Sequence, residues 1–318
     1  MSIDFNTLAA LYSTKAEDIK KINGGNYNQA YEFEHLGEKY ILRISPEEGE
    51  ITHLEQIMKY MYKHNQLGSS VVVPVKSVNN SFVETINDGE NELLVTVLKK
   101  EPGNTYEDFD NNTISEGIFY KIGRNLAVLH NNSSHLEHEM SNLVNWYEKD
   151  SCFNILGELE EAEAGVAEKY YKYKALCLDI PKNNENYGII HGDLHFSNII
   201  INHEAETVCY CDFDDNCKGF YIMDVAMIFF DLKVVLSCDN KQEAMCRYMQ
   251  LILQGYNDIS AHEKAAVKKL ENFLKLLEIS LYIQYSKYYD ENDTEDTWLN
   301  RFCKDRRKRI IMDIPYLD

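Results

Sequence analysis

The sequence predicts an α+β fold in which a short, strand-rich segment precedes a longer, mostly helical one. Apolar and polar residues alternate over residues 29–35, as they do in half-buried strands, and a return strand is predicted after the turn at residues 36–38. Beyond residue 105, apolar residues recur at the spacing of amphipathic helices. The chain of 318 residues exceeds what one compact core usually holds, so we expect two lobes.

The strand-rich segment is predicted to begin with a hairpin. Residues 19–45 predict strands around the glycine-containing loop GGNYN and the turn Leu36-Gly37-Glu38. A helix is predicted over residues 50–66, where apolar residues fall on one helical face: Ile51, Leu54, Ile57, Met58 and Met61. Further strands around residues 71–75 and 92–98 give five strands and one helix, ending near Lys99.

Pro102 and Gly103, in the stretch KKEPGNTYED, mark a hinge. We therefore expect an N-terminal nucleotide-binding lobe at residues 1–98 and a hinge at 99–105. The remaining residues, 106–318, are expected to form a catalytic and acceptor-binding lobe.

Composition and charge exclude several classes of partner. Asp and Glu number 52 against 32 Lys and Arg, and the resulting net charge of −20 repels nucleic acid and attracts cations. No apolar run approaches the roughly 18 residues that a membrane span needs. The N-terminus lacks the pattern of a secretory signal, and the eight cysteines form no CxxC pair. A cytoplasmic protein without nucleic-acid or membrane partners is expected.

The most informative stretch is IIHGDLHFSNIIINHEAETVCYCDFDD, residues 189–215. Asp193 follows a predicted strand, Asn198 comes five residues later, and Asp212 follows a second predicted strand. Phosphoryl transfer from a nucleotide needs a carboxylate that orients the attacking hydroxyl, and oxygen ligands for magnesium. The spacing from Asp193 to Asn198 is also that of the kinase catalytic loop. The stretch therefore favours a phosphotransferase.

These motifs resemble those of the aminoglycoside phosphotransferase and choline kinase family, which shares a protein-kinase-like fold. HGDLHFSN is similar to the catalytic loop of that family, and CDFDD is similar to its metal-binding strand. Asp224 matches an aspartate that begins the next helix and supports the catalytic loop. GGNYNQAYEF resembles the glycine-rich loop, and YILRIS resembles the third strand. The resemblance spans about residues 20–290 and implies a bilobal fold and ATP- and magnesium-dependent transfer, with GTP left open as the donor.

The resemblance also implies a role for each matching residue. Asp193 is the expected catalytic base, and Asn198 and Asp212 are the expected magnesium ligands. The expected nucleotide-binding residues are Gly24, Gly25 and Asn28 over the phosphates, Arg43 on the third strand with Glu55 as its ion-pair partner, and Thr96, Val97 and Leu98 at the adenine slot.

One residue departs from the family pattern. Arg43 stands where the family commonly has lysine. Arginine keeps the positive charge and holds phosphate oxygens through two N–H groups, so we still expect activity. The geometry of its pair with Glu55 is left open, and Lys39 is a second, weaker candidate cation on the same strand face. Asp214 is either a further metal ligand or, more simply, an exposed loop residue.

The expected acceptor is a small alcohol that is cationic or bears an amine, as aminoglycosides and choline do. Candidate partners for its ammonium groups lie in the acidic segment at 140–180 and include Glu158, Glu160, Glu161 and Glu163. In the same segment, Tyr170, Tyr171 and Tyr173 form either a helix face packed on the core or an aromatic cage. The basic stretch RFCKDRRKRI, residues 301–310, is expected as a solvated, salt-bridged terminal helix.

Two other functions stay open at the level of sequence. A protein Ser/Thr kinase of the bacterial stress-response or spore-coat type has similar motifs, but only eleven residues separate Asp212 from Asp224. This gap leaves little room for an activation loop. A non-catalytic nucleotide-binding scaffold would be compatible with Arg43, but it would leave the complete catalytic loop unexplained. The sequence does not predict the oligomeric state.

Overall fold

The computed structural model describes residues 3–22, 29–46, 51–89, 91–106, 114–140, 142–155, 157, 159, 162–236, 238, 240–260, 269–290 and 297–317. The chain divides into two compact units. The first, here called the sheet unit, comprises Met1–Pro102, His138–Ser141 and Cys209–Asp214. The second, here called the helical unit, comprises Gly103–Glu137, Asn142–Val208 and Asp215–Asp318.

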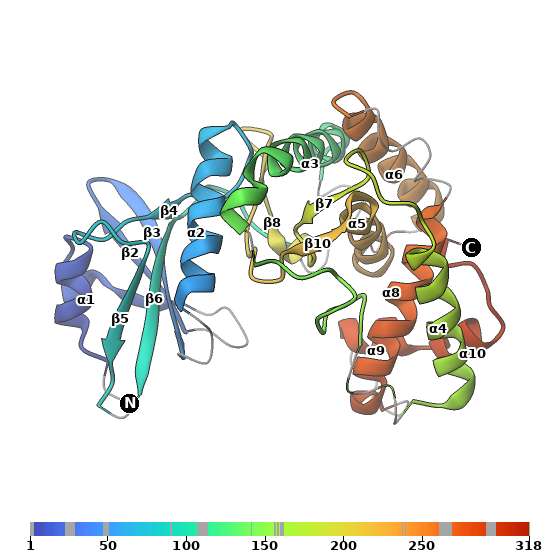
Figure 1. Cartoon of the computed structure of the whole chain (residues 1–318). Coiled ribbons are helices and arrows are strands. Elements are labelled where there is room, and N and C mark those ends of the chain that lie inside the picture. The colour runs from blue at the N-terminus through green and yellow to red at the C-terminus, as the bar shows by residue number, and fades with distance from the viewer. Residues whose placement is uncertain are drawn as a thin grey trace. The chain divides into compact units, whose positions relative to one another are not determined.

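The sheet unit is built on a six-stranded antiparallel sheet within the described residues. Its strands follow the order β1-β2-β3-β6-β4, and β5 also pairs with β6. Figure 1 shows α1 and α2 on either side of this sheet. The elements are α1 (Phe5–Leu11), η1 (Ala16–Asp18), β1 (Lys20–Ile22), β2 (Gln29–His35), β3 (Glu38–Pro46), α2 (Ile51–Gln66), β4 (Pro74–Val75), β5 (Val83–Asn87) and β6 (Glu92–Lys99).

Strand alternation gives the two faces of this sheet different roles. Leu42 and Ile44 of β3 belong to a buried core that also contains Leu8 of α1. Successive side chains of a strand point to opposite faces, so Arg43 lies on the face away from that core. Arg43 is opposite Thr96 in the register of β3 and β6.

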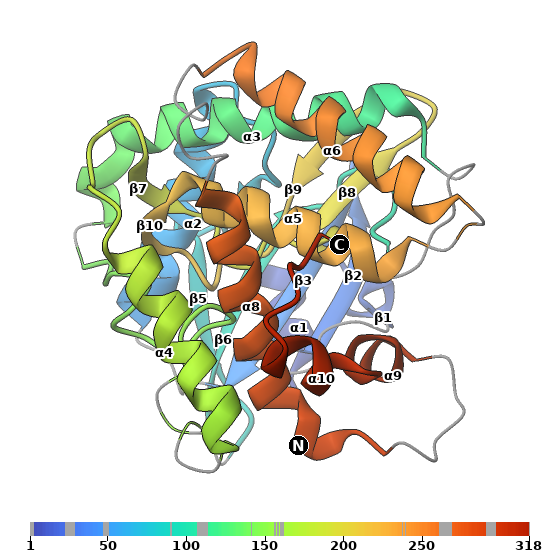
Figure 2. The same cartoon turned by 90° about the vertical axis from the view of Figure 1, so that its right-hand side faces the viewer.

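The helical unit contains the long helices and two short hairpins. Strand β7 pairs with β10, and β8 pairs with β9. Helices α3 and α6 pack along each other, and α8 packs on α4 and α5 (Figure 2). The elements that lie wholly or partly in it are α3 (Glu116–Leu136), η2 (Glu137–Met140), α4 (Ala164–Leu178), β7 (Tyr187–Ile190), η4 (Phe196–Asn198), β8 (Ile199–Asn202), β9 (Thr207–Tyr210), β10 (Cys217–Phe220), α5 (Tyr221–Val235), α6 (Lys241–Asn257), α8 (Leu270–Tyr285), η6 (Ser286–Tyr288), α9 (Trp298–Cys303) and α10 (Arg306–Ile311).

Helix α5 is the central helix of this unit. All of its residues except Lys233 are buried, which is typical of a helix surrounded by other elements. Its first turn carries Asp224, and Phe230 and Asp231 follow two turns later. Helix α5 therefore connects the packing of the unit to the acidic side chains described below. Among the described residues, no helix combines the length and apolar character needed to cross a bilayer.

The α+β fold class is confirmed, with two additions to the predicted elements. Helix α1 begins after Asp4, whose side chain accepts a hydrogen bond from the backbone N–H of Asn6 at 2.9 Å. Strand β5 was not predicted, because Val83 and Ile86 are its buried residues and their spacing breaks the two-residue alternation.

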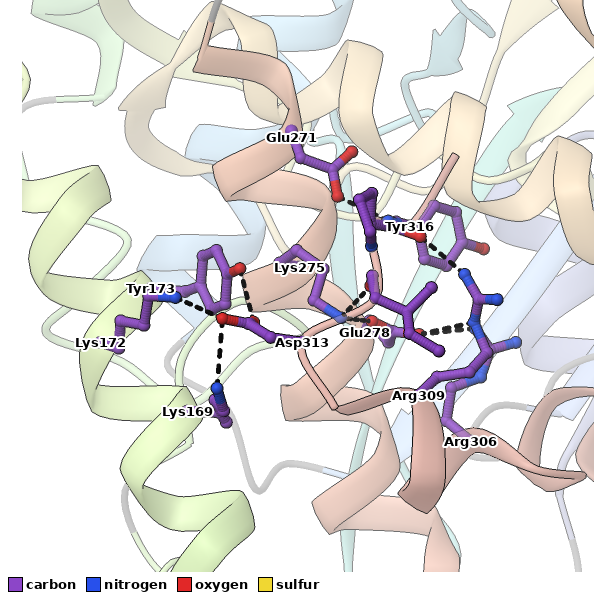
Figure 3. A network of polar contacts seen from close by, with 12 residues as sticks. Lys169, Lys172, Tyr173, Glu271, Lys275, Glu278, Arg306, Arg309, Asp313 and Tyr316 are labelled. Carbon is purple, nitrogen blue, oxygen red and sulfur yellow. Dashed lines mark hydrogen bonds and ion pairs between the residues drawn. The ribbon is translucent and has the colours of Figure 1, made fainter. Parts of the chain in front are cut away.

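The basic stretch near the C-terminus is helical and ion-paired, but it is not simply solvated. Arg306 is buried, and its Nη1 lies 2.7 Å from Oε1 of the fully buried Glu278 (Figure 3). Lys275, also fully buried, pairs with the same carboxylate. The Lys275 ammonium also donates to the carbonyl of Ile314 at 2.9 Å. These cations therefore hold both a buried carboxylate and the last residues of the chain.

Tyr316 fixes the C-terminal segment to α5. Its ring is fully buried and stacks on Phe230, with ring centroids 4.8 Å apart. Its hydroxyl donates to the Phe230 carbonyl at 2.9 Å, and its backbone N–H donates to Glu271 at 2.5 Å. Lys233 donates to its carbonyl. The segment that follows α10 is thus part of the core of the helical unit.

Candidate active site

The loop after β7 is held by one buried carboxylate. The backbone N–H groups of His191 and Gly192 donate to the two oxygens of Asp224, at 2.8 and 2.9 Å. His130 contacts the same carboxylate at 3.0 Å and contacts the Tyr256 hydroxyl at 2.7 Å. Burial alone would raise the pKa of Asp224, but the hydrogen bond and charge of His130 hold it below its ordinary value. Asp224 supports the loop as predicted.

Gly192 occupies a position that suits no other residue. Its φ is +86°, in the left-handed region, and a Cβ atom here would lie 2.3 Å from the carbonyl oxygen of Asp215. Lys149 binds that carbonyl oxygen at 2.9 Å and the Asp215 carboxylate at 3.2 Å. The backbone of Asp215, which Lys149 binds, therefore lies too close to Gly192 to admit a side chain there.

Asp193 presents a partly exposed, ionised carboxylate. Its side chain is 33% exposed, and His195 Nε2 lies 3.4 Å from its Oδ2. Asn198 Nδ2 donates to the Asp193 carbonyl at 2.8 Å and contacts its Oδ2 at 3.5 Å. Burial would raise the pKa of Asp193, but the hydrogen bond and charge of His195 outweigh that effect and lower it. The group can accept a hydrogen bond from a hydroxyl at neutral pH.

The two expected metal ligands fall in different units. In the helical unit, Asn198 donates through its amide nitrogen, and within the described residues its Oδ1 accepts no hydrogen bond. In the sheet unit, Asp212 supplies carboxylate oxygens. Amide and carboxylate oxygens are ligands that suit a hard cation such as Mg²⁺. The structure brings Asn198 together with Asp193, and it assigns Asp212 to the unit that holds Arg43.

The segment that carries Asp212 is fixed inside the sheet unit. The Tyr210 carbonyl accepts from the N–H of Val72 at 2.9 Å, and the Tyr210 N–H donates to the Ser70 carbonyl at 2.9 Å. Phe213 is buried, and its ring meets that of Tyr60 edge-on at 6.4 Å between centroids. These contacts fix the residues before and after Asp212.

Arg43 pairs with both carboxylates of this segment. Its Nη2 lies 2.6 Å from Oδ2 of Asp214, and its Nη1 lies 3.5 Å from Oδ1 of Asp212. The Asp212 backbone adopts a left-handed conformation with φ +64°, which aspartate tolerates better than most residues. The guanidinium side chain is 18% exposed.

The predicted pair of Arg43 with Glu55 is wrong. Glu55 is exposed on α2 and accepts a hydrogen bond from Ser81 Oγ at 3.3 Å. Both residues lie in the described part of the chain, and no ion pair joins them there. Lys39, the second candidate cation, pairs with Glu32 at 3.2 Å. The sequence places Asp212 and Asp214 after the second strand of the motif and does not show that Arg43 reaches them.

The residues of the predicted adenine slot lie inside a strand that is paired on both edges. Thr96, Val97 and Leu98 are buried, and β6 pairs with β3 on one edge and with β4 and β5 on the other. Their backbone groups are therefore used within the sheet, and the side chain of Val97 lies in the core around α1. Gly24, Gly25 and Asn28 lie outside the described residues.

The chain just after β6 offers a free backbone donor. The N–H groups of Lys99 and Lys100 donate to the carbonyls of Val73 and Lys39, each at 2.8 Å. The N–H of Glu101 makes no hydrogen bond within the described residues, and Pro102 has no N–H. The strand pattern of the sequence ends at Lys99, two residues before this position.

The helical unit contains a cavity of about 640 Å³ beside Asp193. Ligand sites commonly have volumes of about 300–1,000 Å³. Four carboxylates line the cavity, namely Asp150, Asp193, Asp215 and Asp231. Its aromatic lining consists of Phe230, Tyr285 and Trp298. The cavity therefore combines concentrated negative charge with flat apolar surface.

The cavity wall is linked to the catalytic loop and to the C-terminal helices. Asp231 accepts a hydrogen bond from the backbone N–H of Phe196 at 2.7 Å. Trp298 stacks on Phe302 at 5.0 Å between centroids. Cys152 also lines the cavity and donates to the Gly192 carbonyl at 3.2 Å. Burial raises the pKa of this thiol, so it stays protonated at neutral pH.

The acidic segment predicted to bind the acceptor has another role where it is described. Glu163 pairs with Arg307 of α10 at 2.6 Å and does not line the cavity. Glu158, Glu160 and Glu161 lie outside the described residues. Tyr170 is buried and bonded to Asn154 at 3.1 Å, and Tyr173 donates to Asp313 at 2.8 Å. The tyrosines at 170 and 173 thus pack on the core and form no aromatic cage.

Comparison with known proteins identifies the family. A model of the phosphotransferase enzyme family matches residues 18–251. The chain belongs to this family. It is 25% identical over 297 residues to the amicoumacin kinase of Bacillus subtilis (strain 168), in a match that covers 89% of this chain and 84% of the relative.

Solved structures show the same fold. The amicoumacin kinase hAmiN, in complex with AMP-PNP, Ca²⁺ and Ami, matches with a TM-score of 0.81 at 21% identity, over 98% of this chain and 92% of that one. A microcompartment-associated aminopropanol kinase matches with a TM-score of 0.66 at 18% identity, over 99% and 98%. The protein-kinase-like fold is therefore confirmed. Membership of the phosphotransferase enzyme family confirms the predicted enzyme class, a small-molecule kinase with an alcohol group as acceptor.

Proposed function

We propose that this enzyme transfers the γ-phosphoryl group of ATP, in the presence of Mg²⁺, to a hydroxyl of a small amine-bearing acceptor bound in the cavity of the helical unit. The observation that carries the proposal is the position of Asp193, the expected base, in the wall of a cavity with three further carboxylates. A base at the edge of an acceptor-sized cavity is what transfer to a small alcohol requires.

In this mechanism, Asp193 orients the acceptor hydroxyl and accepts its proton. The hydroxyl oxygen forms a bond to the γ-phosphorus, the bond from that phosphorus to the bridging oxygen breaks, and ADP leaves. Asn198 and Asp212 would hold Mg²⁺, which neutralises charge on the phosphates when bound. Arg43 supplies a further positive charge to the phosphates.

We assign recognition of the adenine base to the backbone after β6. The N–H of Glu101 is available because it makes no hydrogen bond within the described residues. AMP-PNP is an adenine nucleotide analogue, and the hAmiN structure holds it. This supports ATP as the donor here.

The cationic character of the acceptor follows from charge and shape. Lys149 offsets the charge of Asp215, and the other three carboxylates of the cavity add to a chain with a net charge of −20, so the cavity favours an ammonium group. Phe230, Tyr285 and Trp298 offer surface for the apolar part of the acceptor or for a cation–π contact. The relatives named above are kinases of amicoumacin and aminopropanol, which supports a small acceptor over a protein substrate.

The decisive experiment is a screen for acceptors. Aminoglycosides, choline, ethanolamine, amino sugars and amino acids are incubated with enzyme, Mg²⁺ and ATP labelled at the γ-position, and the labelled products are separated. We expect transfer to at least one amine-bearing alcohol. Transfer to none of them, or transfer only to the protein itself, would contradict the proposal.

Asp193→Asn tests the base with the acceptor that the screen finds. The variant should lower turnover by at least about 100-fold while the melting temperature stays close to that of the parent, because the amide keeps the shape and cannot accept the proton. Asp179→Asn is the matched control, since Asp179 is an exposed residue at the end of α4. An Asp193→Asn enzyme with parental turnover would exclude Asp193 as the base.

A further inference from the structure

The pairing of Arg43 departs from the expected arrangement in a specific way. Of the two carboxylates that it contacts, Asp214 is the nearer by 0.9 Å, at 2.6 against 3.5 Å. Glu55, the partner expected on the helix, is instead bonded to Ser81. We infer that Asp214 is a positioning residue that fixes the Arg43 guanidinium for the nucleotide phosphates. This inference rests on the proposed function.

The geometry explains why arginine serves here. A guanidinium carries five N–H donors in a planar fork, so one edge can bind a carboxylate while another edge faces phosphate oxygens. Asp214 accepts from Nη2 and Asp212 accepts from Nη1, and these two contacts together restrict the plane of the fork. A lysine ammonium presents three N–H donors from one point and lacks the fixed plane of the guanidinium.

Asp214 itself is held in place by its neighbour. Phe213 is buried against Tyr60, so the residue that follows it leaves the core at a fixed point. The short bond to Asp214 also leaves Asp212 with the longer contact to Arg43.

The inference is tested by nucleotide binding, which needs no acceptor. Isothermal titration calorimetry measures the affinity of the parent and of Asp214→Asn for AMP-PNP with Mg²⁺ and for adenosine. Asp214→Asn should bind AMP-PNP about tenfold more weakly, because the guanidinium loses a charge-assisted hydrogen bond, and should bind adenosine as the parent does. Asp214→Glu should recover part of the loss. Glu38→Gln is the matched control, since Glu38 pairs with Lys99 at 2.8 Å on the same sheet.

A double-mutant cycle shows whether Asp214 acts through Arg43. In an Arg43→Ala background, Asp214→Asn should cause no further loss of AMP-PNP affinity. Three results would each overturn the inference. The first is an Asp214→Asn enzyme with the parental affinity for AMP-PNP, and the second is an equal loss of affinity for AMP-PNP and adenosine. The third is an Asp214→Asn effect on AMP-PNP affinity that is as large in the Arg43→Ala background as in the parent. A loss in Glu55→Gln as large as that in Asp214→Asn would also overturn it. If the parent enzyme binds neither AMP-PNP nor adenosine, the proposed function fails. If the parent binds both and Asp214→Asn binds AMP-PNP equally well, only the inference about Asp214 fails.

Discussion

At the scale of single residues, Asp224 is the clearest link between folding and catalysis. It is fully buried, yet its two oxygens satisfy consecutive N–H groups of the catalytic loop. A buried carboxylate is tolerated only when it is paired and hydrogen-bonded, and His130 supplies the pairing. The position of Asp193 therefore depends on a fully buried residue of α5.

Asp224→Ala should lower the free energy of unfolding by about 3–5 kcal/mol at neutral pH, because two backbone donors and His130 lose their buried partner. Urea titration measures the change. The pKa of Asp224 is lowered in the folded protein, so its contribution is fully present above the ordinary value of 3.8. The difference between parent and variant should shrink as the pH falls below 3.8. A difference that grows toward acid would contradict this assignment.

Sequence reasoning placed Asp193 beside Asn198 because both lie in one short loop, and the structure joins them by a hydrogen bond. The contact of Asp224 with that loop followed from the resemblance to the family and is also present. Sequence reasoning failed where the partner lies across the sheet. Whether Arg43 meets Glu55 or Asp214 depends on how a distant segment packs beside β3, which no local pattern records.

At the scale of elements, the C-terminal segment packs against a residue that lines the cavity of the helical unit. Tyr316 stacks on Phe230, and Phe230 lines the cavity. The sequence predicted a basic terminal helix, but the buried partner of Arg306, Glu278, lies on α8. Helix periodicity shows that a segment is amphipathic, and it does not show which charged residues will pair inside the core.

Tyr316→Ala should lower the free energy of unfolding by about 3–5 kcal/mol, because it removes a fully buried aromatic ring. Tyr316→Phe keeps the ring and loses only the hydrogen bond to the Phe230 carbonyl, so it should cost about 1 kcal/mol. Thermal or urea unfolding measures both changes. Equal losses in the two variants would show that the hydroxyl, and not ring packing, fixes the segment.

At the scale of the whole molecule, the net charge of −20 should assist the capture of a cationic acceptor. Raising the ionic strength from about 0.05 to about 0.5 M shortens the Debye length from over 10 Å to under 5 Å. The KM for a cationic acceptor should therefore rise several-fold. The KM for a neutral analogue, in which carbon replaces the ammonium nitrogen, should change little. Steady-state assays at several salt concentrations measure both KM values. If the two KM values respond equally to salt, electrostatic capture is contradicted.

The overall division of the chain could be predicted only in part. The first long segment of the sheet unit ends at Pro102, and Pro102 was a visible hinge signal. The return of residues 138–141 and 209–214 to that unit left no compositional trace. These segments join the sheet unit through tertiary contacts, for example the hydrogen bonds of Tyr210 with Ser70 and Val72. The order of residues along the chain does not show these contacts.

The return of Cys209–Asp214 to the first unit has a consequence for biosynthesis. A nascent chain leaves the ribosome from its N-terminus, so strand β3, which carries Arg43, emerges well before Tyr210, Phe213 and Asp214. Until then, the growing polypeptide exposes the apolar surface of Tyr60 that Phe213 later covers. Cotranslational folding of this unit is therefore expected to finish only after much of the other unit has been translated.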